Sequence, residues 1–180
     1  RNTLRAADRF SPDAAIVRLM EGYPDCAVFL LGNGTSSFVG ATPEDLVRLS
    51  QATGAPLEVN IFHTSSDREE AIARHLKAHG AGEVLLPDGA AVLEGIDSNR
   101  RFVHADGILQ ADAIFVPLED GDRCQALRRL GRDVLTVDLN PLSRTACAAT
   151  VTVVDNVARA LPALLADVVR LGSQPTSTWE

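Results

Sequence analysis

The sequence predicts an α/β protein with a Rossmann-like three-layer fold and a mostly parallel sheet. Short apolar or β-branched runs alternate with longer segments of helical periodicity along most of the chain. Several of the short runs end at glycine or at acid and amide residues. Alternation of this kind is typical of βαβ units, in which parallel strands form the sheet and helices cover both of its faces.

The first predicted elements are a helix, a strand and a second helix. Ser11 is expected to be an N-cap and Pro12 the first residue of a helix that continues over the apolar residues after it. The continuous apolar run 27–31 stops at a glycine and predicts a strand covered on both faces. The second helix is expected to begin around Pro43 and to end at Gly54.

The later elements continue the same alternation. Residues 57–62 predict a strand, and the capping box that begins at Ser66 opens a helix that Gly80 ends. Residues 88–107 lack sustained periodicity and are expected to form a surface excursion near one strand edge. The remaining expected strands lie at 83–86, 113–116, 134–137 and 151–154, and the remaining helices at 122–130 and 156–171.

The length of the chain predicts a single domain. It has 180 residues, 46% of them hydrophobic, which is enough to bury one sizeable core. We expect a nucleotide-binding α/β domain over residues 1–171. Residues 172–180 are polar and rich in turn formers, and they are expected to form a loose tail.

Composition argues against nucleic-acid and membrane partners. The formal net charge of −7 is unsuited to a nucleic-acid surface, although the pairs Arg100-Arg101 and Arg128-Arg129 are still able to hold a small anion. No apolar run approaches the roughly 18–20 residues that a membrane helix needs. Cys26, Cys124 and Cys147 lie far apart without C-x-x-C spacing, which indicates buried thiols in a reducing compartment. We therefore expect a cytoplasmic protein.

The run DLNPLSRT at residues 138–145 is the most informative feature of the chain. It directly follows the apolar stretch 134–137, so an acid, an amide and hydroxyl groups stand at the carboxyl end of a buried strand. Open α/β sheets bind their ligands at this edge. Asp155 and Asn156 close another strand in the same way. The two strand ends would form one pocket if the strands are neighbours.

Three further segments are candidate sites, and each also has a simpler structural explanation. Residues 32–37 offer backbone N–H groups and hydroxyls to an anion, but a plain turn has the same pattern and the lysine of a Walker A loop is missing. Residues 117–123 carry three carboxylates and an arginine, which suit Mg²⁺ waters or a cationic amine, or merely a helix cap. Residues 98–101 carry two guanidinium groups that suit a phosphate or carboxylate, but a solvated loop without a ligand would have the same sequence pattern.

Six segments in order give the chain a family resemblance. Together they extend over roughly residues 25–165, and they are far more specific than a lone glycine motif. The chain resembles the archaeal-type 4-phosphopantoate–beta-alanine ligases, also called phosphopantothenate synthetases. The segments are EVNIF (58–62), HGA (79–81), SNRR (98–101), PLEDGDR (117–123), DLNPLSRT (138–145) and ATVTVVDN (149–156).

This resemblance implies a cytosolic, homodimeric enzyme that uses ATP and Mg²⁺. It would join the carboxylate of 4-phosphopantoate to the amine of beta-alanine, through an acyl adenylate, and form 4'-phosphopantothenate for coenzyme A biosynthesis. Its partners would be these small-molecule carboxylate and amine substrates, with no nucleic acid and no membrane. Two alternatives stay open: a relative that ligates a different carboxylate and amine, and a nucleotide-binding module without catalysis.

The resemblance also implies roles for individual residues. The nucleotide site would consist of Asp138, Leu139, Asn140, Arg144, Thr145, Asp155 and Asn156. The substrate-binding residues would be Asn33, Asn60, Asn99, Arg100, Arg101 and Glu119. The reaction itself requires that arginine and Mg²⁺ offset the repulsion between two anions, so on chemical grounds Arg144 is expected to contact phosphates and to take part in catalysis with Asp120 and Asp122. Arg100 and Arg101 would hold the substrate phosphate, whereas Glu119, Asp120 or Asp122 would orient Mg²⁺ or the ammonium group of beta-alanine. No metal ligands are assigned.

Overall fold

The computed structural model of the chain describes residues 28–32, 37–41, 43–61, 66–118 and 120–172. The chain divides into two compact units, Arg1–Glu44 and Asp45–Glu180. The predicted helix that begins near Ser11, residues 33–36 of the glycine turn and residues 173–180 of the tail lie outside the described residues.

The first unit contains an antiparallel pair of strands. Strand β1 (Val28–Gly32) matches the predicted apolar strand, and it pairs with β2 (Ser37–Ala41), which the sequence did not predict. The pairing begins at Val28 opposite Ala41 and ends at Gly32 opposite Ser37.

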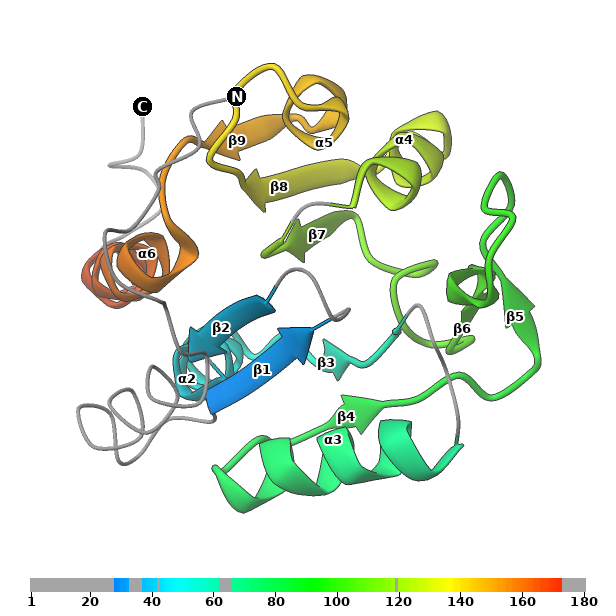
Figure 1. Cartoon of the computed structure of the whole chain (residues 1–180), viewed down its shortest axis with the longest axis horizontal. Coiled ribbons are helices and arrows are strands. Elements are labelled where there is room, and N and C mark those ends of the chain that lie inside the picture. The colour runs from blue at the N-terminus through cyan, green and yellow to red at the C-terminus, as the bar shows by residue number, and fades with distance from the viewer. Residues whose placement is uncertain (1–27, 33–36, 42, 62–65, 119, 173–180) are drawn as a thin grey trace. The chain divides into compact units, whose positions relative to one another are not determined.

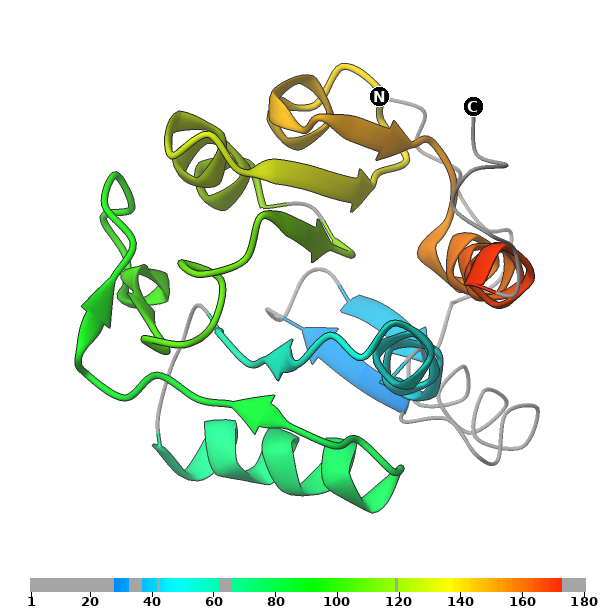
Figure 2. The same cartoon turned by 180° about the vertical axis from the view of Figure 1, so that it is seen from behind.

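The second unit opens with a βαβ arrangement. Helix α2 (Pro43–Thr53) is followed by β3 (Leu57–Glu58), α3 (Ser66–Ala78) and β4 (Val84–Leu85). β3 and β4 are parallel, and Figures 1 and 2 both show α3 beside β4. Both predicted helix stops are confirmed, because Gly54 and Gly80 have φ values of +73° and +91°. β3 is shorter than the predicted strand at 57–62, although the N–H of Val59 still donates to Leu85 at 3.0 Å.

A three-stranded parallel sheet positions the candidate site. Its order is β7 (Ala113–Val116), β8 (Asp133–Val137) and β9 (Val151–Val153), and the three strands run in one direction in Figure 1. The crossovers contain α4 (Gly121–Arg129) and a short helix, α5 (Arg144–Ala148), and α6 (Val157–Gly172) follows β9. The buried hydroxyl of Thr136 donates to the carbonyl of Val116 at 2.8 Å and ties β8 to the end of β7.

Residues 88–107 are not merely the surface excursion that the sequence predicts. They form an antiparallel pair, β5 (Ala91–Val92) with β6 (Phe102–Val103), and a 3-10 turn, η1 (Asn99–Arg101). Leu93, Ile96 and Val103 from this segment are buried in the same core cluster as residues of α4 and β8. The apolar residues of this segment fall in short groups without sustained helical or strand periodicity, so only tertiary packing reveals them as core.

The α/β prediction is confirmed by the parallel pairs and the helices that connect them. The two antiparallel pairs are additions to that plan. The cysteine prediction is confirmed for Cys124, which is fully buried, and is wrong for Cys147, which is exposed because it faces outward from α5. Cys26 lies outside the described residues. Within the described part of the chain, every helix is too short or too polar to cross a membrane.

Candidate functional site

The carboxyl ends of β8 and β9 lie side by side, which meets the condition that the sequence analysis left open. Val137 pairs with Val153 across the parallel ladder, and the N–H of Asp138 donates to the carbonyl of Val153 at 3.1 Å. The acid and amide residues that follow the two strands therefore leave the same edge of the sheet. This is the edge at which open α/β sheets bind ligands.

Hydrogen bonds within the 138–145 loop fix its shape. Asp138 accepts from the N–H of Asn140 at 2.8 Å and also from the hydroxyl of Ser143. The side chain of Asn140 in turn accepts from the N–H of Leu142 at 3.0 Å. Ser143 caps α5 by accepting from the N–H of Ala146 at 3.0 Å. Hydrogen bonds between its own residues thus hold the loop in shape, whereas the side chain of Leu139 in the same loop is exposed.

Arg144 and Thr145 begin α5 and have opposite exposures. The Arg144 side chain is 57% exposed, while Thr145 is fully buried. Among the described residues, the Thr145 hydroxyl has no hydrogen-bond partner. The stem of Arg144 crosses Gly121 so closely that a Cβ added there would lie 3.1 Å from Arg144 Cγ and 2.5 Å from Nε. The absence of a side chain at Gly121 on α4 therefore leaves the space that the Arg144 side chain occupies.

The polar residues that follow β9 make contacts that mainly stabilise the start of α6. Asp155 accepts from the N–H of Asn156 at 2.6 Å and forms an ion pair with Arg159. The hydrogen bond from Arg159 holds the pKa of Asp155 below its usual value. The side chain of Asn156 accepts from the N–H of Ala158 at 2.9 Å, in the manner of an N-cap of α6. Both predicted residues thus lie at the sheet edge, where they also organise the start of a helix.

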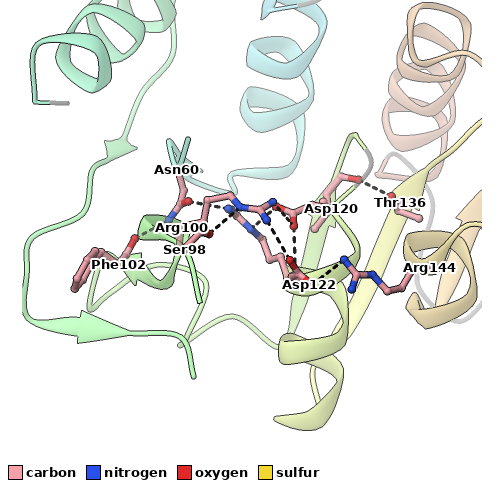
Figure 3. Close-up of polar contacts among 10 residues, drawn as sticks. Asn60, Ser98, Arg100, Phe102, Asp120, Asp122, Thr136 and Arg144 are labelled. Atoms are coloured by element: carbon pink, nitrogen blue, oxygen red, sulfur yellow. Dashed lines mark hydrogen bonds and ion pairs between the residues drawn. The ribbon is translucent and has the colours of Figure 1, made fainter. Parts of the chain in front are cut away.

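Asp120 holds two arginines at the start of α4 (Figure 3). Its Oδ1 accepts from Arg100 Nη1 at 2.6 Å, and its Oδ2 lies 3.0 Å from Arg123 Nε. All three side chains are largely buried, with exposed fractions of 14% for Asp120, 17% for Arg100 and 12% for Arg123. Asp120 is also the N-cap of α4, because its Oδ1 accepts from the N–H of Arg123 at 3.3 Å.

Asp122 joins Arg100 of this buried group to Arg144 at the end of the sheet-edge loop. Its Oδ1 lies 2.7 Å from Arg144 Nη2, and its Oδ2 lies 3.3 Å from Arg100 Nη2. The alternating charges form a chain in the order Arg123, Asp120, Arg100, Asp122 and Arg144 (Figure 3). We call these five residues the arginine–aspartate chain. It brings together residues from three segments, 98–101, 117–123 and 138–145, which the sequence analysis proposed separately.

Asn60 supports the buried end of this chain. Its amide nitrogen donates to the carbonyls of Arg100 and Phe102 at 3.0 and 2.6 Å, and its oxygen accepts from Arg123 Nη2 at 2.7 Å. Two residues earlier, the carboxylate of Glu58 accepts from the N–H groups of His104 and Ile108 at 3.1 and 2.8 Å. The side chains of Glu58 and Asn60 therefore tie the end of β3 to the 98–108 segment.

Arg123, Glu58 and Gly121 are functional candidates that sequence reasoning missed. Arg123 and Gly121 lie within the PLEDGDR segment but received no role there. Glu58 had one available signal, namely an acidic residue inside a short apolar strand. Burial lowers the pKa of Arg123 from its usual value, and the charge of Asp120 opposes that effect. The neighbouring carboxylate therefore compensates a charge that burial disfavours.

Several predicted residues lie outside this cluster. Arg101 is exposed, and its guanidinium carbon lies 4.9 Å from the ring centroid of Phe102. Asn99 is also exposed. Arg128 donates to the carbonyl of Arg132 at 2.7 Å and lies 3.2 Å from the carboxylate of Asp133, so it is engaged at the other end of β8. Asn33 and Glu119 fall outside the described residues.

A complete protein cage for a metal ion is not found in the described ranges. They contain no group of three or more His, Cys, Asp or Glu side chains placed to hold an ion. Mg²⁺ seldom requires such a cage, because it usually keeps several waters and binds one or two carboxylates together with phosphate oxygens. The half-exposed carboxylate of Asp122 is compatible with that mode.

Comparisons with known proteins agree with the resemblance of the six segments. A family model described as phosphopantothenate/pantothenate synthetase matches residues 27–180. The 4-phosphopantoate–beta-alanine ligase of Methanosarcina mazei is 50% identical over 119 residues, which are 66% of this chain and 47% of that protein. The ligase of the same name from Methanospirillum hungatei is 41% identical over 159 residues, 88% of this chain and 62% of that protein.

A more distant relative shows the same partial coverage. The ligase of that name from Thermococcus kodakarensis is 37% identical over 164 residues, which are 91% of this chain and 60% of that protein. The chain thus spans between 47% and 62% of the length of these relatives. Because the family model covers residues 27–180 and the similarity includes both halves of the candidate site, the chain belongs to the phosphopantothenate/pantothenate synthetase family.

Proposed function

We propose that this chain is an ATP-dependent ligase that joins 4-phosphopantoate and beta-alanine to form 4'-phosphopantothenate in coenzyme A biosynthesis. The names of its relatives support the reaction. One geometric observation supports the site, namely the 2.7 Å contact between Arg144 and Asp122. It connects the sheet-edge loop, where a nucleotide would bind, to a group of arginines suited to a second anion.

The nucleotide would lie at the carboxyl edge of β8 and β9. Asp138 and Asn140 shape the loop there, and Arg144 extends from its end with more than half of its side chain exposed. We assign Arg144 to the ATP phosphates, because a guanidinium group can donate two parallel hydrogen bonds to two oxygens of a phosphate. Leu139, Thr145, Asp155 and Asn156 would complete this site.

The acid substrate would bind at the neighbouring arginine. Arg100 is fixed by Asp120 and Ser98, whose hydroxyl lies 3.2 Å from Arg100 Nε. Bringing two phosphate-bearing molecules together requires cationic groups between them, and Arg100 and Arg144 share the carboxylate of Asp122. Arg101, Asn99, Asn33 and Glu119 remain candidate contacts for the acid or the amine. Electrostatic stabilisation and positioning would supply much of the rate enhancement.

The proposed chemistry has two steps with a balanced exchange of bonds. A carboxylate oxygen of the acid attacks the α-phosphorus of ATP, and the bond to pyrophosphate breaks. The unprotonated amine of beta-alanine then attacks the acyl carbon, a proton leaves the nitrogen, and AMP departs. Mg²⁺ would arrive with the ATP phosphates and offset their charge, and of the two aspartates at the start of α4 Asp122 would be the more accessible to its waters.

Release of pyrophosphate and AMP tests this function directly. The chain would be incubated with ATP and Mg²⁺, with 4-phosphopantoate and beta-alanine added singly and together, and the product identified by mass. Product that requires both substrates supports the ligase. Turnover with another acid or amine would instead indicate a relative of different specificity. ATP binding without turnover of any pair would indicate a nucleotide-binding module.

The Arg144→Ala variant tests the assignment of the phosphate contact. We expect ATP binding or turnover to weaken by about 1–3 kcal/mol, the range of a charge-assisted hydrogen bond. Arg170→Ala is the matched control, because Arg170 forms a surface pair with Asp167 on α6. Equal ATP affinity and rate in both variants would remove Arg144 from the site.

We also propose that the chain forms a homodimer and acts in the cytoplasm. Large apolar side chains on β9 and on the segments that follow β8 and β9 support the dimer, because Leu139, Leu142, Val151 and Val154 are between 50% and 84% exposed. Light scattering coupled to size-exclusion chromatography measures the oligomeric state. A monomer at micromolar concentration would contradict the proposal.

A further inference from the structure

We propose that Asp122 is a resident counter-ion that holds Arg100 and Arg144 together until an anionic group of a substrate or product takes its place. This inference rests on the proposed function of the two arginines. It assigns to Asp122 a positioning role that is different from binding Mg²⁺ or an ammonium group. The role follows from the way in which one carboxylate is divided between two cations.

Each oxygen of Asp122 serves a different arginine. Oδ1 lies 2.7 Å from Arg144 Nη2 and Oδ2 lies 3.3 Å from Arg100 Nη2. Two guanidinium groups that approach one carboxylate in this way would repel each other without it. A phosphate group has the same ability to bridge them, with more oxygens and more negative charge. Asp122 therefore occupies the position that a bridging phosphate would favour.

The contacts of Asp122 are the exchangeable ones in the arginine–aspartate chain. Arg100 keeps its orientation through Asp120 at 2.6 Å, so the longer contact to Asp122 is not needed to place it. Asp122 and Arg144 are 40% and 57% exposed, whereas Asp120 and Arg123 are 14% and 12% exposed. Solvent-exposed pairs are weak because water screens them and side-chain entropy opposes them. The outer contacts are thus able to break while the inner ones persist.

Replacing the carboxylate of Asp122 by an amide removes the competing charge with little change of shape. We expect the Asp122→Asn variant to bind inorganic pyrophosphate and ATP about three- to tenfold more tightly than the unchanged chain, since a local competing charge is lost. Tighter binding of pyrophosphate also slows its release. Catalytic turnover should therefore fall while the apparent affinity for ATP rises, a combination that simple loss of structure does not produce.

Calorimetric titration with pyrophosphate, and separately with ATP, is the deciding experiment. Asp112→Asn is the matched control, because Asp112 is a fully exposed carboxylate paired with Arg132 and the variant changes net charge by the same amount. Tighter binding to Asp122→Asn alone supports the counter-ion. Equal tightening in both variants, unchanged binding, or weaker binding to Asp122→Asn would overturn it, the last because it would make Asp122 a direct ligand.

The same titrations separate this inference from the proposed function. If the unchanged chain binds pyrophosphate but not ATP, the nucleotide assignment fails while the counter-ion is still judged by the pyrophosphate affinities. If neither ligand binds to any variant, both fail, because the two arginines then do not form an anion site. If the chain binds ATP and forms product but Asp122→Asn changes no affinity, the ligase stands and the counter-ion is wrong.

Discussion

Asp120 and Asp122 are two residues apart, yet Asp120 belongs to the buried part of the arginine–aspartate chain and Asp122 to its exposed part. Asp120 is 14% exposed, contacts Arg100 and Arg123, and caps α4. Asp122 is 40% exposed and contacts Arg100 and Arg144. The difference shows how a single short segment supplies both a fixed anchor and an exchangeable contact. Burial decides which of the two carboxylates acts in which way.

The inner end, Arg123 with Asp120 and Arg100, is also supported by the neutral side chain of Asn60. Asn60 uses both donors of its amide and its oxygen to hold Arg123 and the backbone at Arg100 and Phe102. Arg144 instead lies against Gly121 and reaches Asp122 with its exposed guanidinium group. A site built in this way keeps one arginine rigid and leaves the other able to follow a ligand.

The largest expected effect comes from removing the inner carboxylate. Asp120→Ala leaves Arg100 and Arg123 without their shared counter-ion in a largely buried place, and we expect a loss of about 3 kcal/mol in the free energy of unfolding. Urea denaturation measures this loss. Asp122→Ala is the internal control and should cost less than about 1 kcal/mol. Equal losses from the two variants would contradict the division into a fixed and an exchangeable end.

The next largest effect is expected at Asn60. Asn60→Ala removes three hydrogen bonds and leaves part-buried carbonyls and a guanidinium group without that partner, so stability should fall by about 2 kcal/mol. Denaturation of Asn99→Ala is the comparison, because Asn99 is exposed on η1. If the two variants are equally stable, the inner end does not depend on Asn60.

Gly121→Ala tests the outer end without removing any charge. The new methyl group would collide with the Arg144 side chain, and we expect ATP to bind about tenfold more weakly because the guanidinium group is displaced. Stability should change by less than about 1 kcal/mol, since alanine is favourable in a helix. Gly82→Ala, where the added atom has no neighbour within 4 Å, is the control for both measurements. A large loss of stability with normal ATP binding would contradict this view of Gly121.

The smallest expected effect concerns the reactivity of two thiols, those of the buried Cys124 on α4 and the exposed Cys147 on α5. Burial, and then the charge of Asp120, raises the pKa of Cys124 to about 11, whereas Cys147 on α5 is exposed. Alkylation followed by peptide mass analysis at pH 8 should label Cys147 and leave Cys124 unmodified until urea is added. Labelling of Cys124 in the folded chain would show that the inner end opens readily.

The same cysteine gives a dependence of stability on pH. Above the ordinary thiol pKa of 9.0 the unfolded chain loses a proton that the folded chain retains up to about pH 11. Unfolding therefore becomes easier as the pH rises through this window, because the unfolded state binds fewer protons. Cys124→Ala should reduce that part of the pH dependence, as measured by urea denaturation at pH 8.5 and 10.5.

Local sequence signals predicted most of the longer helices, the strands of the parallel pairs and one edge of the site, but not β2, β5, β6 or α5. The helix stops at Gly54 and Gly80 and the polar residues that end β8 and β9 follow from composition and periodicity, whereas the pairing of β8 with β9 appears only in the structure. The burial of Leu93 and Val103 did not follow, because the short apolar groups of this segment carry no sustained periodic signal. The exposure of Cys147 was missed because α5 is too short to display a helical pattern.

The sequence by itself determined the α/β class and the family, and it located the acid and amide residues that end the strands. Those properties depend on short-range patterns and on ordered motifs. Only the tertiary structure decided that Asp122 lies between Arg100 and Arg144, and that Asn60 is a brace for Arg123. Such contacts join segments distant in the chain, and their strength depends on burial, which appears only when the chain is folded.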